Sequence, residues 1–352
     1  YNSEIFYAFT QDILRSLIQL AFVWLVVILG NKPVAESKFI IDLAAFAKIF
    51  IIASLTYLGI YVAATKGVAN DLSGANLLPH LNGSSLSNLS VIIFNFLGFE
   101  VVATMSGNMD NPQKQIPKAM IFGGVLIALL YLLAAFSMGV AIPAAKLSPS
   151  SGLLDSFILL LGKMNWFVIL IGVFFLYTLA SEMVSWALGV NIVSDYAAKD
   201  GALPQIFGKE DKNKMPVGTG YLNGIVATIL VIIAPFIPNQ DIFWAFFSLN
   251  VVALLLSYTL MFPAFIKLRQ LQPEKKRPFK VSGNKLMINL VTWVPELLLI
   301  ATIIMTIVPL NGSHAEITSK LPILIGTIIT IILGEVIVRF AEKRAQRSVK
   351  KG

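Results

Sequence analysis

Long apolar segments constrain this chain more than any other feature of its sequence. Nine of them cover residues 15–31, 39–65, 86–105, 119–142, 166–194, 217–237, 240–266, 288–310 and 321–340. An α-helix crosses the hydrocarbon core of a bilayer with roughly 20 apolar residues, whereas a barrel strand needs only about 9–11 alternating residues. The sequence therefore predicts an all-α polytopic membrane protein with nine transmembrane helices.

The composition indicates a single transmembrane domain over residues 1–352. Of the 352 residues, 57% are hydrophobic and 13% are charged, whereas soluble domains have about 45–50% and about 25%. The sequence contains no Cys and only two His, so disulfides and thiolate metal sites are excluded and no other metal or cofactor site is expected. Nothing in the sequence resembles a Walker or dinucleotide-binding motif, and we expect neither a cofactor nor an enzyme activity.

The distribution of basic residues predicts the orientation in the membrane. When the connecting segments are assigned alternately to two sides, 21 of the 27 Lys and Arg fall on one side and five on the other. Such a bias places the richer side, which includes the C-terminus, in the cytoplasm. We expect a multi-pass protein of the cell (inner) membrane, with the lipid bilayer as a partner. The basic stretch 273–280 is then a cytoplasmic loop, and no nucleic-acid partner is expected.

The N-terminus is predicted to lie outside the cell, because nine spans separate it from a cytoplasmic C-terminus. The chain begins at Tyr1 and shows no signal-like segment. We therefore expect one or more further helices upstream of this sequence.

Four ionisable residues fall deep inside the predicted spans: Lys48, Glu100, Glu182 and Glu296. A charged side chain at the centre of a membrane helix costs about 2.5–3.5 kcal/mol on insertion scales. These residues are therefore paired, neutral or facing water. Two interpretations remain open for each of them, namely structural pairing between helices and a polar pathway through the bundle.

One predicted span contains an interruption. The stretch SVIIFNFLGFEVVATMSGNMDNPQKQIP covers residues 90–117, and Gly98 lies in it among bulky apolar side chains. A short span that a Gly interrupts is typical of a discontinuous transmembrane helix, although a single Gly can also be tolerated in a packed helix. Unwound backbone occurs at this depth only where it lines a cavity or is buried in protein. Glu100, just beyond Gly98, could attract a cation, bind a substrate or carry a proton.

Several motifs together resemble the amino acid–polyamine–organocation (APC) superfamily. The sequence Gly98–Phe99–Glu100 and the following NPQKQIPKA resemble its sixth helix and the loop after it. AAKDGALPQIFGK with MPV resembles the loop between helices eight and nine, and RPFKV the loop between helices ten and eleven. LAAFAKIF resembles the start of the fifth helix. IPAAKLSPSSGLLDSF is similar to the glutamate/GABA antiporter branch.

The resemblance implies a LeuT-like inverted-repeat fold. The nine spans would correspond to helices four to twelve of twelve, with about the first three absent from this sequence. Residues 1–65 would be a remnant of the first repeat, residues 86–266 the second five-helix repeat, and residues 288–340 two peripheral helices.

The resemblance also implies a set of site residues. The substrate-binding residues would be Phe94, Asn95, Phe96, Leu97, Gly98 and Trp244. Gating or proton coupling would fall to Glu100, Lys48 and Glu182, with Lys48 replacing a bound cation. Further pocket candidates are Ser181, Phe247 and Asn250. The aromatic residues could instead pack in the core, and Asn250 could instead join two helices.

The predicted function is secondary amino-acid transport, by antiport or by proton coupling. Its substrates would be small amino acids or their decarboxylation products. The alternative is a non-coupled channel, or an amino-acid sensor that retains the pocket. The sequence leaves the oligomeric state and the particular substrate open.

Overall fold

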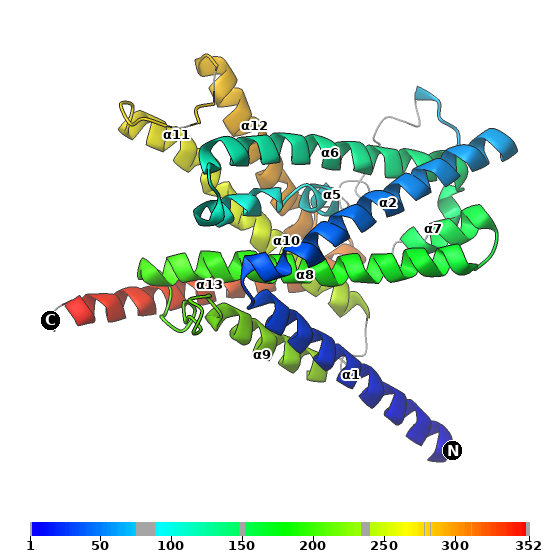
Figure 1. Ribbon diagram of the computed structural model, residues 1–352, viewed down its shortest axis with the longest axis horizontal. Coiled ribbons are helices and arrows are strands. Elements are labelled where there is room, and N and C mark those ends of the chain that lie inside the picture. Colours follow the sequence, from blue (N-terminus) through cyan, green and yellow to red (C-terminus); the bar gives the residue numbers. More distant parts are fainter. Residues whose placement is uncertain are drawn as a thin grey trace. The chain divides into compact units, whose positions relative to one another are not determined.

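The computed structural model describes residues 2–74, 89–147, 152–233, 240–277, 279–281, 283–310 and 312–349 (Figure 1). Its helices are α1 (Asn2–Gly30), α2 (Val34–Lys66), α5 (Leu89–Asn95), α6 (Pro112–Ala141), α7 (Gly152–Leu161), α8 (Trp166–Lys199), α9 (Gly218–Ile233), α10 (Gln240–Thr259), α11 (Met261–Leu271), α12 (Lys285–Ile307) and α13 (His314–Val349). Two 3₁₀ helices, η1 (Phe99–Asn108) and η2 (Ala144–Lys146), are also present. The described residues contain one isolated β-bridge and no strand, which confirms the all-α prediction.

Within the described residues, seven helical segments are long and apolar enough to cross a membrane. They are Ile13–Gly30, Lys38–Lys66, Pro112–Ala141, Trp166–Lys199, Trp244–Leu271, Lys285–Ile307 and Glu316–Arg344. The two other predicted spans, 217–237 and 86–105, do not form long apolar helices among the described residues. Helix α9 has 16 residues, and the segment predicted at 86–105 is divided between α5 and η1. The protein is a multi-pass membrane protein.

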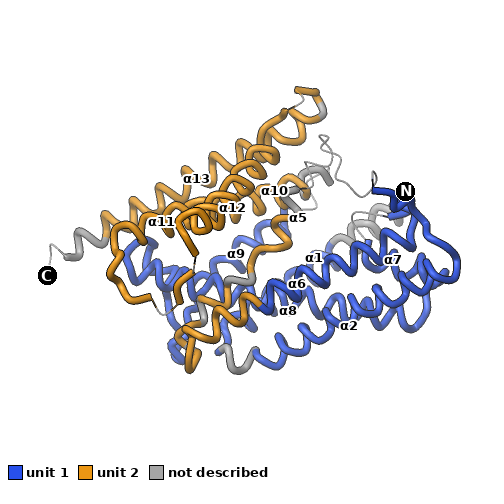
Figure 2. Tube along the Cα trace, turned by 90° about the horizontal axis from the view of Figure 1, so that it is seen from above, with its two compact units in different colours: residues 1–78, 122–236 blue, residues 79–121, 237–352 orange. Residues whose placement is uncertain are grey.

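The chain divides into two compact units, drawn in different colours in Figure 2. Unit 1 consists of residues 1–78 and 122–236, and unit 2 of residues 79–121 and 237–352. The predicted division into repeats at 1–65, 86–266 and 288–340 stays a prediction.

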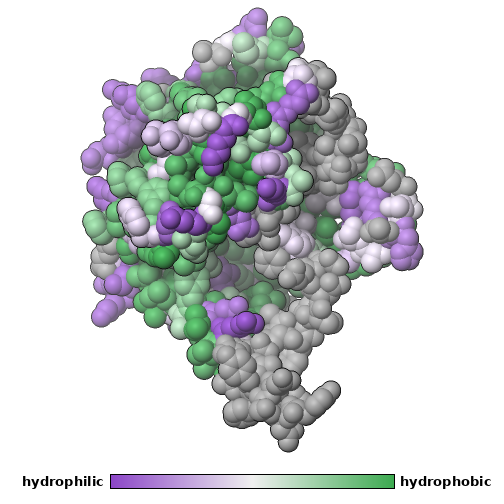
Figure 3. All heavy atoms as spheres, turned by 90° about the vertical axis from the view of Figure 1, so that its right-hand side faces the viewer, coloured by the Kyte–Doolittle hydropathy of each residue, from purple (hydrophilic) through white to green (hydrophobic). Residues whose placement is uncertain are grey.

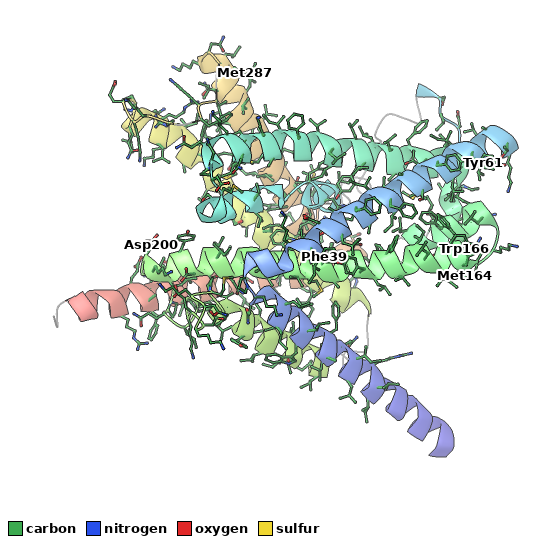
Figure 4. All side chains as sticks on the ribbon, in the orientation of Figure 1. Phe39, Tyr61, Met164, Trp166, Asp200 and Met287 are labelled. Atoms are coloured by element: carbon green, nitrogen blue, oxygen red, sulfur yellow. The ribbon has the colours of Figure 1, made fainter. Side chains whose placement is uncertain are left out.

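In unit 1, α8 is the central helix. It packs against α2, α1, α7 and α9, and α1 also packs against α9. Ile51 and Leu55 of α2 lie one turn apart and pack with Phe157 of α7 and Ile171 of α8 in one buried core. Figure 4 shows Trp166 and Tyr61 at one end of α8 and α2, and Asp200 at the other end of α8.

The packing of α1, α8 and α9 depends on small residues. Asn191 of α8 donates hydrogen bonds from Nδ2 to Asn31 Oδ1, at 3.0 Å, and to Gly30 O, at 3.3 Å. A Cβ at Gly220 would lie 2.2 Å from Asn31 Oδ1, and a Cβ at Gly224 would lie 2.9 Å from a methyl group of Val27. The Gly220–Gly224 pair therefore allows close packing of α9 on its neighbours in this chain.

Replacing Gly220 with alanine is expected to destabilise unit 1. The new methyl group would overlap Asn31 Oδ1 and displace the buried Asn31–Asn191 hydrogen bond, and overpacking of this kind costs about 1–3 kcal/mol. Thermal unfolding of the purified protein in detergent should show a lower midpoint. Gly139→Ala in α6 is the matched control, because its Cβ would meet nothing within 4 Å. Equal midpoints for the two variants would contradict the close packing.

In unit 2, α10 packs against α5, α12 and α13. Val251, Val252 and Leu255 of α10 form the buried core with Leu299 and Ile303 of α12 and Ile323 of α13. Glu296, which the sequence placed deep in a span, is 4% exposed in α12. The sequence left open whether Glu296 pairs with another helix or faces a polar pathway. Its Oε2 has no hydrogen-bond partner in the described part of the chain.

Large apolar side chains are exposed along the predicted spans. On α6, Phe122, Leu132 and Phe136 are 73%, 66% and 56% exposed. On the face drawn in Figure 3, hydrophobic side chains occupy much of the coloured surface, with hydrophilic ones between them. Soluble monomers rarely carry apolar surface on this scale, whereas a lipid-facing surface requires it.

Candidate functional site: a discontinuous helix and an intramembrane ion pair

Helix α5 ends at Asn95, three residues before Gly98. The next two residues form a tight turn rather than a further α-helical turn. Phe96 N donates to Ile93 O at 2.9 Å, and Leu97 N donates to Phe94 O at 3.0 Å. The segment predicted to be discontinuous is therefore discontinuous, and this prediction is confirmed.

Gly98 lies at the junction between α5 and the next helical segment. Its φ is +99° and its ψ is −16°, in the left-handed region that side chains with a Cβ avoid. The chain continues as η1, a 3₁₀ helix of ten residues. 3₁₀ runs longer than three or four residues are uncommon, and a 3₁₀ stretch inside a helix often marks a functional hinge, so η1 is an unusual continuation of a membrane segment.

Three aromatic side chains meet beside this discontinuity, and we call them the aromatic cluster: Phe94, Trp244 and Phe247. The ring of Phe247 lies 5.8 Å from that of Phe94 and 5.9 Å from that of Trp244, with interplanar angles of 70° and 83°. The edge-to-face contact between Phe94 and Phe247 connects α5 to α10, whereas Trp244 and Phe247 lie one turn apart on α10. Phe94 and Phe247 also pack against the buried core of unit 2, whereas Trp244 is 45% exposed. The cluster thus combines core packing with an exposed aromatic surface.

The remaining expected residues of unit 2 are placed as follows. Leu97 packs against the core beside Phe94. Asn95 and Phe96 are exposed, Phe96 to 39%. Asn250 is exposed on α10, about one turn beyond Phe247. The side chain of Glu100 lies outside the described side chains, so its expected role stays a prediction.

In unit 1, Lys48 and Glu182 form an ion pair. Lys48 Nζ of α2 donates a hydrogen bond to Glu182 Oε2 of α8. Both residues lie well inside segments that can span the membrane, where either charge alone would be costly. Both side chains are nevertheless 47% exposed. The structure therefore supplies the partner that each charge needs without sealing the pair in the core.

A second contact between α2 and α8 lies near this ion pair in sequence. Ser181 Oγ donates to Ile40 O at 3.4 Å, and Tyr177 Oη donates to the same oxygen at 3.0 Å. Ser181 is 3% exposed, so this predicted pocket residue joins the two helices. The sequence interpretation missed Tyr177, although its position four residues before Ser181 puts both side chains on one face of α8.

Among the described residues, no group of three His, Asp or Glu side chains could hold a metal ion. Lys48 pairs with the carboxylate of Glu182, and its expected role in place of a bound cation stays a prediction.

Apolar spanning helices, a helix interrupted at a left-handed Gly and an ion pair inside the spans define a polytopic membrane protein of the transporter class. Residues 2–333 match the amino acid permease family, and the chain belongs to that family. The family and its relatives are transporters, not enzymes, and the APC resemblance is confirmed.

Relatives with named activities cover different shares of the chain. The "Probable agmatine/putrescine antiporter AguD" of Lactococcus lactis is 49% identical over 92% of this chain and 70% of its own length. A glutamate/gamma-aminobutyrate antiporter of the same species is 27% identical over 76% of this chain and 56% of its own. The cadaverine/lysine antiporter of Escherichia coli is 24% identical over 49% and 40%. This chain therefore spans only part of the length of each relative.

Proposed function

We propose that this protein is a secondary antiporter that exchanges agmatine for putrescine. The observation that carries this proposal is the 49% identity to the agmatine/putrescine antiporter, which extends over 92% of the chain. The identity to the glutamate/gamma-aminobutyrate antiporter is 27%. Glutamate/GABA exchange is the second candidate, and the loop IPAAKLSPSSGLLDSF favours it.

The chemistry of the discontinuity supports an organic cation as the substrate. Agmatine carries a guanidinium and an ammonium group, and putrescine carries two ammonium groups. Aromatic faces attract such cations, with contributions from about 0.5 to 2 kcal/mol, and the aromatic cluster includes the partly exposed Trp244. Helix α5 also ends at this place, and the negative end of a helix favours a cation.

The proposal includes roles for the two groups of residues. Phe94, Trp244 and Phe247 would contact the substrate, together with the main chain at 95–98. The Lys48–Glu182 pair would act in gating, because a half-exposed pair can open and re-form as the helices move. The bias of 21 to five basic residues supports a cytoplasmic C-terminus in the cell (inner) membrane.

Exchange in proteoliposomes tests the proposal. The protein is reconstituted in vesicles that contain putrescine, and uptake of labelled agmatine is measured against empty vesicles. We expect internal putrescine to stimulate uptake by about tenfold or more, since an antiporter returns its empty site slowly. Vesicles loaded with GABA and supplied with labelled glutamate form the parallel test of the second candidate.

The other outcomes separate the alternatives. Glutamate uptake that depends on internal GABA, without agmatine uptake, would replace the first proposal by the second. Equal agmatine uptake with and without an internal substrate would indicate a non-coupled channel. Saturable agmatine binding without any uptake would indicate a sensor.

A further inference from the structure

A basic cavity lies in unit 2, where α11 ends and α12 begins. Figure 1 labels these two helices. Its volume is about 750 Å³. Four cationic side chains line it: Arg269 of α11, Arg277 and Lys280 of the loop, and Lys285 at the start of α12. None of the residues that line the cavity, all of them in the described part of the chain, is acidic. We call this site the basic cavity.

The two arginines are held by the main chain rather than by carboxylates. Arg277 Nη2 donates to Leu268 O at 3.1 Å and to Gln272 O at 2.9 Å, and thereby caps the C-terminus of α11. Arg269 Nη2 donates to Val281 O at 3.0 Å. Because neutral carbonyl groups hold both guanidinium groups, their positive charges are not cancelled at the cavity.

Arg269 has a further property that points to an anion. Its other terminal nitrogen, Nη1, is buried and has no hydrogen-bond partner among the described residues. An unsatisfied buried donor of this kind is costly. An acceptor oxygen that entered beside this guanidinium would supply the missing partner after a small movement of the side chain. Phosphate oxygens suit a guanidinium because they accept two parallel hydrogen bonds.

The position of the basic cavity indicates that the anion belongs to a membrane lipid. Helix α12 is a membrane-spanning segment that begins at Lys285, so the cavity lies at the level where headgroups meet the protein. Ile266 and Ile288 contribute apolar wall. On the same first turn of α12, Leu286 and Met287 are 67% and 50% exposed, and Figure 4 shows Met287 at this end of the helix. Cations beside exposed apolar side chains match a phosphate headgroup with its acyl chains.

The positive-inside bias explains why the loop is basic, but it does not explain why four basic residues meet at one cavity. Basic residues at the cytoplasmic end of a transmembrane helix are known to attract anionic lipids. We propose that the basic cavity binds the phosphate headgroup of an anionic phospholipid. The choice of the cytoplasmic leaflet rests on the orientation given under the proposed function.

Native mass spectrometry of the purified protein tests this assignment. Phosphatidylglycerol is titrated against phosphatidylcholine, and the test variant is Lys280→Gln with Lys285→Gln, which leaves both arginine hydrogen bonds in place. The matched control is Lys275→Gln with Lys276→Gln, which removes the same charge from the same loop but outside the cavity. We expect one tightly bound phosphatidylglycerol in the wild type and in the control. Binding to the test variant should weaken by about tenfold or more, since each Lys near an anionic headgroup contributes about 1 kcal/mol.

Three results would overturn the assignment. Equal weakening in both double variants would show a general effect of loop charge. Equal binding of phosphatidylcholine and phosphatidylglycerol would show that the headgroup charge is not recognised. Competition by millimolar inorganic phosphate would assign the cavity to free phosphate instead of a lipid. Because the assay measures no transport, its result is independent of whether agmatine exchange is observed.

Discussion

Substitution of Gly98 by valine is expected to reduce agmatine exchange by at least about tenfold, while the protein still inserts into the membrane. A β-branched residue at a φ of +99° is strained, and strain of this kind costs about 1–3 kcal/mol. The segment after α5 would relieve it by changing the direction of η1. That change would move the main chain of residues 95–98 away from the aromatic cluster. Uptake of labelled agmatine into putrescine-loaded vesicles measures the effect.

The control for this substitution is Gly124→Val in α6. A Cβ at Gly124 would meet nothing within 4 Å, and Gly124 is not among the residues with positive φ. This variant should retain nearly the full exchange rate. Wild-type exchange by Gly98→Val would show that transport does not depend on the left-handed conformation at Gly98, and would remove the discontinuity from the proposed site.

Breaking the Lys48–Glu182 pair is expected to have the second large effect. Lys48→Met leaves the Glu182 carboxylate without its partner inside a spanning segment, where an unpaired charge costs up to about 2.5–3.5 kcal/mol. The half-exposed state of both side chains reduces this value. We expect a lower unfolding midpoint in detergent and a loss of exchange of about tenfold or more.

A double substitution separates a structural pair from a gating pair. Lys48→Met with Glu182→Gln removes both charges, so the unfolding midpoint should recover in either case. Recovery of stability without recovery of exchange supports gating, whereas recovery of both would show that the pair only holds α2 to α8. Arg339→Met is the matched control, because Arg339 and Glu335 form an exposed i,i+4 pair on α13, and exposed pairs contribute about 0–1 kcal/mol.

The class of protein and the discontinuous helix were both predictable from local sequence. Apolar segment length indicates a spanning helix wherever it occurs, because the bilayer thickness is nearly constant. Gly98 could be identified because it interrupts a short span among bulky apolar residues, which is the pattern of a discontinuous helix. The length of η1 was not predictable, since 3₁₀ runs longer than three or four residues are uncommon.

The partners of individual side chains were less predictable. The sequence showed that Lys48 and Glu182 each needed a partner, but they are 134 residues apart, and a hydrophobic pattern indicates which face of a helix is buried, not which helix covers it. The same limit applies to Tyr177, whose hydroxyl donates to Ile40 O across 137 residues. The aromatic residues at 94, 244 and 247 were candidates individually. The contact of Phe94 with Phe247 required the packing of α5 on α10, whereas Trp244 and Phe247 are neighbours on α10 itself.

The basic cavity shows what could be predicted from the sequence and what required the tertiary structure. The sequence by itself determined that this protein is an all-α membrane protein and that residues 273–280 are basic, and both follow from local composition. It also indicated an interrupted helix at Gly98, and the resemblance of several motifs pointed to the APC superfamily. Only the tertiary structure decided that Lys48 pairs with Glu182, and that Arg269, Arg277, Lys280 and Lys285 converge on one cavity. The Lys48–Glu182 pair depends on the packing of two helices that are far apart in the chain. The four basic residues lie within one short stretch, and the fold of the loop between α11 and α12 brings them to one cavity.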